Sequence, residues 1–174
     1  MKNFAVILAV DEKMGLGKGN ALPWRLSRDM QRFREVTIPA AEGKLNAVVM
    51  GRRTWESLPA KFRPLPGRIN VVLSAQTGLA LPDGVSRAGS LDEALVLLTA
   101  RADVADIFII GGGVVFAEAV QHPACNKIYL TRIAGDFSCD VFFAPLSADF
   151  KLLRSSEEFK ENSLSFQFQD FERL

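Results

Sequence analysis

The chain has 174 residues, of which 48% are hydrophobic and 24% charged, and 21 basic against 20 acidic residues give a formal net charge of +1. This composition excludes a protein that binds nucleic acid through bulk positive charge, and it excludes a disordered acidic protein. One histidine and two cysteines (Cys125 and Cys139) exclude a multi-histidine metal site, a CxxC redox pair and a disulfide-rich scaffold. The two cysteines have no charged neighbours in sequence, so we expect them to be inert.

The N-terminal apolar segment is predicted to be a buried strand rather than a signal peptide. The apolar run at residues 4–10 is short, Asp11 ends it, and no small-residue cleavage site follows. No other stretch approaches the ~18 apolar residues that span a bilayer. We therefore expect a cytoplasmic protein of one domain.

Short apolar runs alternate with helical patterns along the chain. Strands are predicted at residues 4–10, 47–50, 69–74, 107–110 and 127–133. Helices are predicted at 29–37 after an N-cap at Ser27, at 54–58, after a capping box of Ser90 and Glu93, and at 114–120. Residues 59–67 and 76–89 are predicted loops, and the alternation near the C-terminus predicts an antiparallel hairpin at the sheet edge. This order predicts an α/β domain with a mostly parallel sheet.

Three consecutive glycines, Gly111, Gly112 and Gly113, lie between a predicted buried strand and a predicted helix. Glycines let the backbone approach an anion, and a helix start presents free N–H donors and the positive end of the helix dipole. The segment matches neither the G-x-G-x-x-G fingerprint nor a P-loop. It is therefore either an anion-binding turn or a tightly packed junction that binds nothing.

A second strand-to-helix junction carries basic and hydroxyl groups, since Gly51 is followed by Arg52, Arg53 and Thr54. Guanidinium groups suit phosphates and carboxylates, although a solvated basic face has the same composition. The segment Ser74-Ala75-Gln76 follows the next strand, at the edge where open α/β sheets bind ligands. It carries no acid of the kind that holds an NAD ribose, so the hypothesis is a dinucleotide with a 2′-phosphate.

Asp29 lies in the first turn of a predicted helix, where an acid commonly complements the helix dipole. It shares a helix face with Met30, Phe33 and Thr37, and this face is largely apolar. A carboxylate in an apolar wall is unfavourable unless it is paired or meets a ligand. The amidine-like edge of a heterocycle would satisfy it with two parallel hydrogen bonds.

Several short motifs follow one another in a fixed order. They include Gly15-Leu16-Gly17, Leu22-Pro23-Trp24, Met50-Gly51-Arg52, Pro64-Leu65-Pro66-Gly67-Arg68, Ile110-Gly111-Gly112-Gly113 and Tyr129-Leu130-Thr131. In this order and spacing, the whole chain resembles the dihydrofolate reductase family. The resemblance implies a single domain over 1–174 with a twisted, mostly parallel eight-stranded sheet, an antiparallel C-terminal edge strand and four flanking helices. It also implies an adenosine-binding subdomain near residues 46–103.

The resemblance further implies a reaction and its ligands. NADPH would give a hydride to C6 of 7,8-dihydrofolate, N5 would gain a proton, and the tetrahydrofolate formed would support one-carbon metabolism. The sequence offers no general acid for N5 beyond Asp29, so water under its influence would deliver the proton. The ligands would be dihydrofolate, NADPH and antifolate inhibitors, with no metal, nucleic acid or membrane. Nothing in the sequence requires more than a monomer.

Each matching position takes an implied role. Asp29 would hold the 2-amino and N3 edge of the pterin, with Thr131 hydrogen-bonded to it. Trp24 would position water, and Leu22 would belong to the loop that closes over the nicotinamide. Arg68 would grip the glutamate α-carboxylate. The other substrate contacts would be Ile7, Leu8, Met30, Phe33, Leu58, Leu65 and Ile110. The cofactor contacts would be Ala9, Leu16, Gly17, Asn20, Gly51, Arg52, Arg53, Thr54, Leu73, Ser74, Ala75, Gln76, Gly111, Gly112, Gly113, Val114, Val115 and Phe116. A cis peptide would join Gly111 and Gly112.

Three positions depart from the family pattern. Phe116 replaces a common Tyr, Val114 replaces a commonly basic residue, and Cys139 occupies a loop position where bacterial relatives often have Gly. These departures leave the reaction intact and concern loop motion, inhibitor sensitivity and cofactor affinity.

Two other functions remain open from the residues themselves. One is a related NADPH-dependent reductase of another pterin or pyrimidine, against which Asp29, Phe33 and Arg68 favour a folate with an acidic tail. The other is a non-catalytic nucleotide-binding module, which would need the glycine turns and basic strand ends but not Asp29, Trp24 and Thr131 together.

Overall fold

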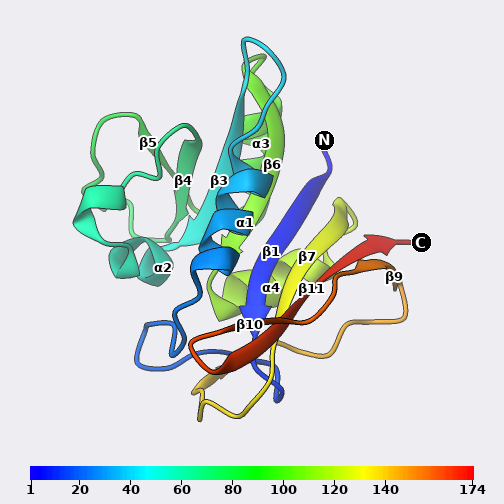
Figure 1. Ribbon diagram of the computed structural model, residues 1–174. Coiled ribbons are helices and arrows are strands. Elements are labelled where there is room, and N and C mark those ends of the chain that lie inside the picture. Colours follow the sequence, from blue (N-terminus) through cyan, green and yellow to red (C-terminus); the bar gives the residue numbers. More distant parts are fainter.

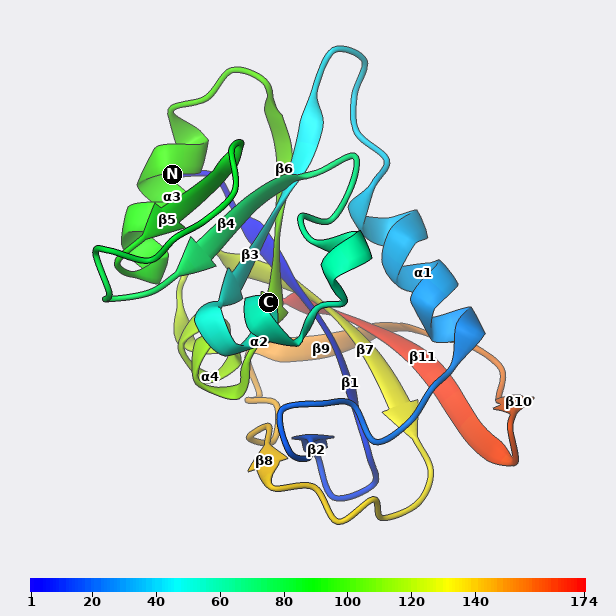
Figure 2. The same cartoon turned by 90° about the vertical axis from the view of Figure 1, so that its left-hand side faces the viewer.

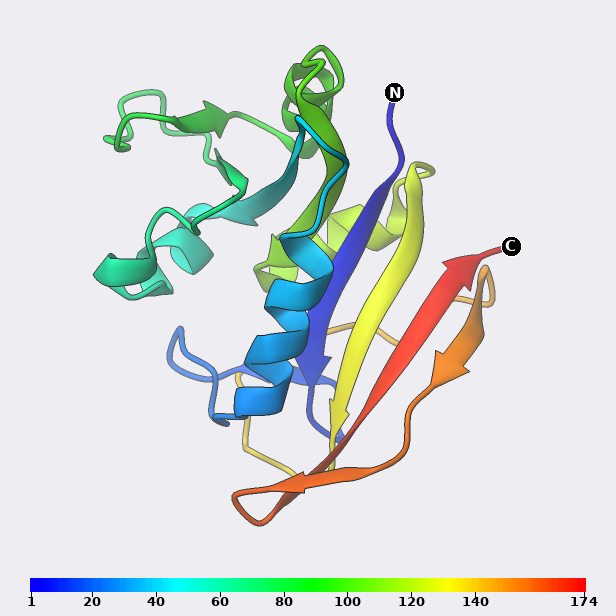
Figure 3. The same cartoon turned by 45° about the horizontal axis from the view of Figure 1, so that its top comes forward.

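A twisted sheet runs through the computed structural model, which describes residues 1–174, and helices cover both faces of the sheet (Figures 1 and 3). In spatial order the strands are β10 (Phe159–Glu161), β11 (Leu164–Arg173), β7 (Cys125–Ile133), β1 (Phe4–Val10), β6 (Val104–Gly111), β3 (Leu45–Gly51), β4 (Ile69–Leu73) and β5 (Val85–Ala88). The strands from β7 to β5 run parallel, and β11 lies antiparallel to β7. The outermost position is shared by β10 and β9 (Phe150–Ser155), which both pair with β11. The predicted sheet, with its antiparallel C-terminal edge, is confirmed.

The central strands are apolar because both of their faces are covered. Val6 and Leu8 of β1 belong to the core under α3 (Leu91–Thr99) and α4 (Gly113–Gln121). Ala5 and Ile7 point to the opposite face, where α1 (Ser27–Thr37) and α2 (Arg52–Ser57) pack. Since successive residues of a strand alternate between faces, a strand buried on both sides has few polar positions, such as Asn46 of β3 and Asn70 of β4.

The helix starts show one correct and one wrong capping prediction. Ser90 caps α3, and its hydroxyl accepts from the backbone N–H of Glu93, as predicted. Ser27 is not the N-cap of α1, because Leu26 occupies that position and Ser27 is already helical. The carboxylate of Glu161 on β10 accepts from the backbone N–H groups of Ser27 and Arg28 at 2.6 and 3.2 Å. A charged acceptor from the C-terminal hairpin thus replaces the local hydroxyl.

The elements that the sequence analysis missed are short. Strand β5 lies inside the predicted loop 76–89, and a 3₁₀ turn occupies Ala60–Phe62. A small second sheet pairs β2 (Gly15–Gly17) with β8 (Val141–Phe142), at the bottom of Figure 2. Such strands carry too few residues for a periodic pattern, and each pairs on one side only. No helix is long and apolar enough to cross a membrane.

Both cysteines are free and buried. Burial raises the pKa of the Cys125 thiol to about 11. Burial and the neighbouring Asp11 carboxylate also raise the pKa of Cys139. Because the thiolate is the reactive form, both thiols are poorly reactive, as expected.

Candidate active site

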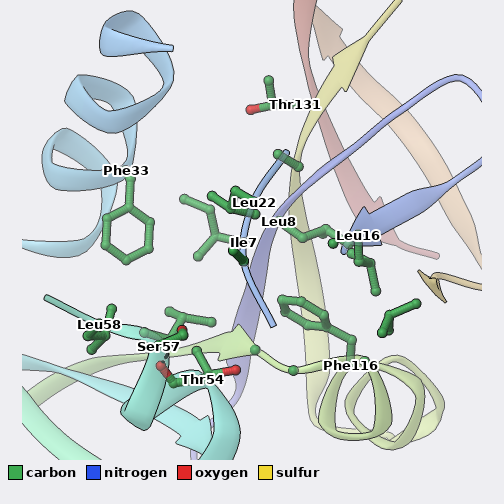
Figure 4. A pocket seen from close by; sticks show the side chains of 18 of the residues that line it. Ile7, Leu8, Leu16, Leu22, Phe33, Thr54, Ser57, Leu58, Phe116 and Thr131 are labelled. Atoms are coloured by element: carbon green, nitrogen blue, oxygen red, sulfur yellow. Dashed lines mark hydrogen bonds between the residues drawn. The ribbon is translucent and has the colours of Figure 1, made fainter. Parts of the chain in front are cut away.

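A cavity of about 320 Å³ lies between α1 and α2, at the carboxyl ends of β1 and β6 (Figure 4). Phe33 of α1 points across it towards Leu58 and Ser57 at the end of α2. The predicted site residues that line it are Ile7, Leu8, Ala9, Leu16, Gly17, Asn20, Leu22, Asp29, Met30, Phe33, Thr54, Leu58, Leu65, Ile110, Gly111, Gly112, Gly113, Phe116 and Thr131. A mostly apolar cavity with a few converging polar groups is typical of a small-molecule site.

Asp29 provides a carboxylate in the apolar wall of this cavity. The hydroxyl of Thr131 donates to Asp29 Oδ1 at 2.5 Å. Its other oxygen, Oδ2, has no donor in the protein and is accessible, so a ligand in the cavity can reach it. Burial raises the pKa of Asp29, and the Thr131 hydrogen bond and the charge of Arg32 oppose this effect. The carboxylate is thus held in place by one hydrogen bond, and its second oxygen can accept from a cationic or donor-rich ligand.

Arg68 and Trp24 are predicted site residues that do not line the cavity. Arg68 is buried and donates to Thr37 Oγ1 and to the carbonyl of Pro66, both at 3.0 Å. Its guanidinium carbon lies 5.6 Å from the centre of the Phe33 ring, so the charge is close to the aromatic wall of the cavity. Trp24 is also buried, and its Nε1 is a donor without an acceptor in the protein.

At the glycine turn the cavity is lined by backbone atoms, because the three glycines have no side chains. Gly111, Gly112 and Gly113 all line it, and a cis peptide joins the first two. A Cβ on Gly111 would lie 2.8 Å from Thr54 Oγ1, and a Cβ on Gly113 would lie 2.5 Å from Val141 Cγ1. The glycines therefore allow close packing as well as close approach of a ligand. The first N–H groups of α4 have no acceptor within the helix and lie at this turn.

The comparisons agree with this geometry. A family model described as Dihydrofolate reductase matches residues 3–173. The dihydrofolate reductase of Heliothis virescens is 38% identical over 97% of this chain and 96% of its own length. The chain belongs to the dihydrofolate reductase family. Its structure is similar to that of the Schistosoma mansoni dihydrofolate reductase, with a TM-score of 0.88, 37% identity and 99% of each chain covered.

Some relatives are much longer than this chain. The bifunctional dihydrofolate reductase-thymidylate synthase of Glycine max is 41% identical over 99% of this chain. The chain spans about a third of the length of such bifunctional relatives, 34% in that protein. The family resemblance and the fold class implied by it are therefore confirmed, and the individual residue roles stay predictions.

Nine other predicted site residues, among them Arg52 and Arg53, do not line the cavity. The predicted residues outside the lining, besides Trp24 and Arg68, are Gly51, Arg52, Arg53, Leu73, Ser74, Ala75, Gln76, Val114 and Val115. Arg52 forms an ion pair of 2.9 Å with Glu56, and Asn20 Nδ2 donates to the carbonyl of Arg53. Arg87 of β5, which the sequence analysis did not name, donates to the carbonyl of Ser74 at 2.7 Å. Its charge lies at the predicted 2′-phosphate end.

Five lining residues were absent from the predicted site, namely Ala21, Arg32, Ser57, Asp140 and Val141. Asp140 accepts from the backbone N–H of Gly19 at 3.0 Å, which connects the segment before β8 to the loop that carries Leu22. Arg32 could have been found from its spacing, because it lies three residues after Asp29 and beside Phe33, on the same helix face. Its charge made an outward position the natural expectation.

Proposed function

We propose that the chain reduces 7,8-dihydrofolate to 5,6,7,8-tetrahydrofolate with NADPH, by hydride transfer to C6 and water-mediated protonation of N5. The observation that carries the proposal is the Asp29 carboxylate, held by Thr131 in an apolar cavity that the glycine turn also lines. A nucleotide-binding module has no use for this buried carboxylate.

The residues around Asp29 suit a flat heterocycle with an acidic tail. Asp29 accepts from the 2-amino and N3 groups of the pterin, which form the amidine-like edge that a carboxylate matches. Ile7, Phe33 and Leu58 supply apolar walls for the ring and the aminobenzoyl group. Arg68, near Phe33, binds the glutamate α-carboxylate.

The glycine turn fits a dinucleotide. Its three glycines expose backbone where side chains would fill the space, and α4 begins there with free N–H donors. The chemistry that NADPH supplies when bound is a hydride for C6 of the pterin. Leu16, Leu22 and the glycine turn would exclude water from the nicotinamide end. Residues 46–103, with Arg52, Arg53, Ser74 and Gln76, would hold the adenosine end and its phosphates.

Protonation of N5 follows from the same carboxylate. Burial raises the pKa of Asp29, whereas a cationic pterin edge favours the ionised carboxylate. The ionised form in turn favours protonation of the bound heterocycle. The unsatisfied Trp24 Nε1 is a donor that can position the water that delivers this proton.

The proposal also covers the cellular location, the inhibitors and the oligomeric state of the protein. A cytoplasmic location is supported by two free buried thiols, which suit a reducing compartment. The cavity would also admit antifolate heterocycles that present the same amidine edge. The protein would work as a monomer, since nothing in the sequence requires more.

The test is NADPH oxidation with three substrates: dihydrofolate, a dihydropterin that lacks the tail, and none. We expect oxidation with dihydrofolate, much less with the tail-free pterin and none without substrate. Equal rates with both pterins would favour the related reductase of another heterocycle. Tight NADPH binding without turnover of any pterin would favour the binding module.

A further inference from the structure

Arg32 is the least expected residue of the cavity. It lies in the middle of α1, lines the cavity together with Asp29, and only 10% of its side chain is exposed. Its Nη1 donates to the carbonyl of Leu130 at 3.4 Å, and its guanidinium carbon lies 4.4 Å from the centre of the Phe168 ring. A buried arginine is rare and needs partners for its charge.

The partner of this buried cation is a buried anion on the sheet. Arg32 Nη2 forms an ion pair with Asp170 of β11, whose side chain is 13% exposed. The second oxygen of Asp170 accepts from Arg154 of β9 at 3.0 Å, and Arg154 is 77% exposed. The charges therefore form a chain from the cavity to the surface, with Arg32 at its inner end.

Stability alone does not account for this arrangement. Apolar residues of similar volume commonly replace a buried ion pair without loss of stability, because desolvation of both charges offsets their attraction. An apolar pair would suit this position well, since the rings of Tyr129 and Phe168 already surround Arg32. The feature of the arrangement that an apolar pair could not reproduce is the positive charge beside the cavity.

We propose that Arg32 is a positioning residue for the reaction, whose buried charge keeps the Asp29 carboxylate ionised and oriented towards the substrate. This inference rests on the proposed function. Arg32 follows Asp29 by three residues, so both side chains lie on the same face of α1. No hydrogen bond joins them, and the Asp29 oxygens stay available to Thr131 and the ligand.

The charged groups around Asp29 act in opposite directions. The charge of Arg32 lowers its pKa, and the Glu161 carboxylate on β10 raises it. Glu161 accepts from two backbone N–H groups at the start of α1, which stabilise its charge. Asp170 and Arg154 act on Arg32, the first favouring its cationic form and the second opposing it. Arg32 is thus the one cation that directly offsets the desolvation of Asp29.

The test measures the pH dependence of binding of a 2,4-diamino-5-benzylpyrimidine, whose protonated ring presents an amidinium edge to Asp29. Its affinity falls on the acid side as the carboxylate becomes protonated, so the acid midpoint reports the Asp29 carboxylate in each variant. Asp29→Asn is the control that should abolish this acid limb. An acid limb that survives in Asp29→Asn would overturn the inference.

The main variant is Arg32→Met with Asp170→Leu, which removes both charges and keeps the core filled. We expect its acid midpoint to rise by about one pH unit, so that affinity falls about threefold midway between the two midpoints and about tenfold at pH values below both. Arg32→Lys keeps the cation and should keep the midpoint near that of the original protein. An unchanged midpoint in the folded double variant would show that Arg32 only packs the core.

A second variant should shift the acid midpoint in the opposite direction, and this test does not depend on folding of the double variant. Asp170→Asn leaves Arg32 charged and removes its anion, so the midpoint should fall. A midpoint that rises or stays constant in Asp170→Asn would overturn the inference. Failure of the original protein to reduce dihydrofolate would instead refute the proposed function, and the inference with it.

Discussion

Replacement of Asp29 by Asn tests the central assignment most directly. The amide keeps an oxygen that can accept from Thr131, but it places an N–H₂ donor where the pterin needs an acceptor. Two charge-assisted hydrogen bonds to the heterocycle are lost, at about 1.5–3 kcal/mol each. Their sum of roughly 3–6 kcal/mol corresponds to a loss of about 10²–10⁴-fold in kcat/KM for dihydrofolate at neutral pH.

The same variant should not lose stability. Since burial raises the pKa of Asp29, ionisation of this group disfavours the fold at pH values above its unfolded pKa. The Asn variant removes that penalty, so its Tm at pH 7 should equal or exceed that of the original protein. The difference should shrink as the pH falls and the carboxylate becomes protonated in both states. Steady-state kinetics and thermal melts over pH measure both effects, and a loss of kcat/KM below about tenfold would refute the reasoning.

Three further predictions concern other residues of the site and of the fold. Arg68→Leu should raise KM for dihydrofolate more than it lowers kcat, and should remove the preference over a tail-free pterin in steady-state kinetics. Gly113→Ala should lower the free energy of unfolding by about 1–3 kcal/mol, because the new Cβ would lie 2.5 Å from Val141 Cγ1, and Val141→Ala should restore most of it in denaturant titrations. Asp11→Asn should be destabilising at pH 7. Burial tends to raise the pKa of Asp11, but three backbone N–H donors outweigh it and lower the pKa. Its contribution is therefore present above the unfolded pKa and is lost as the pH falls through the folded pKa, so acid melts of the two proteins should converge.

The central sheet could be predicted because its strands are buried on both faces. Residues 4–10 match β1 in full, since this strand is covered on both sides, carries only apolar side chains and ends at the polar Asp11. The start of α1 could not be predicted in the same way. Its first N–H groups bond to Glu161, more than 130 positions away in sequence, and no local pattern encodes such a partner. Ser27 therefore gave a plausible but wrong cap.

The residues of the candidate site show the same difference between a local sequence signal and a contact between distant segments. Asp29 and the three glycines could be predicted from the residues, because a carboxylate on an apolar face and a glycine run are unusual in any context. Thr131 was predicted only from the family resemblance. Arg87 and Asp140 depend on contacts between distant segments, such as the bond from Arg87 to the Ser74 carbonyl. A charged residue at these positions is ordinary in sequence, and only the fold shows where its charge goes.

The near-neutral net charge of the chain conceals a separation of charges that the proposed reaction requires. Arg52, Arg53 and Arg68 belong to the predicted phosphate and carboxylate contacts, whereas Asp29 lies in the apolar wall of the cavity, beside the buried charge of Arg32. An isolated buried carboxylate would tend to take up a proton and lose its attraction for a cationic ring. A buried cation one helical turn away opposes this without a hydrogen bond that would compete with the substrate. The ion pair of Arg32 with Asp170 therefore belongs to the chemistry of Asp29 as much as to the packing of α1.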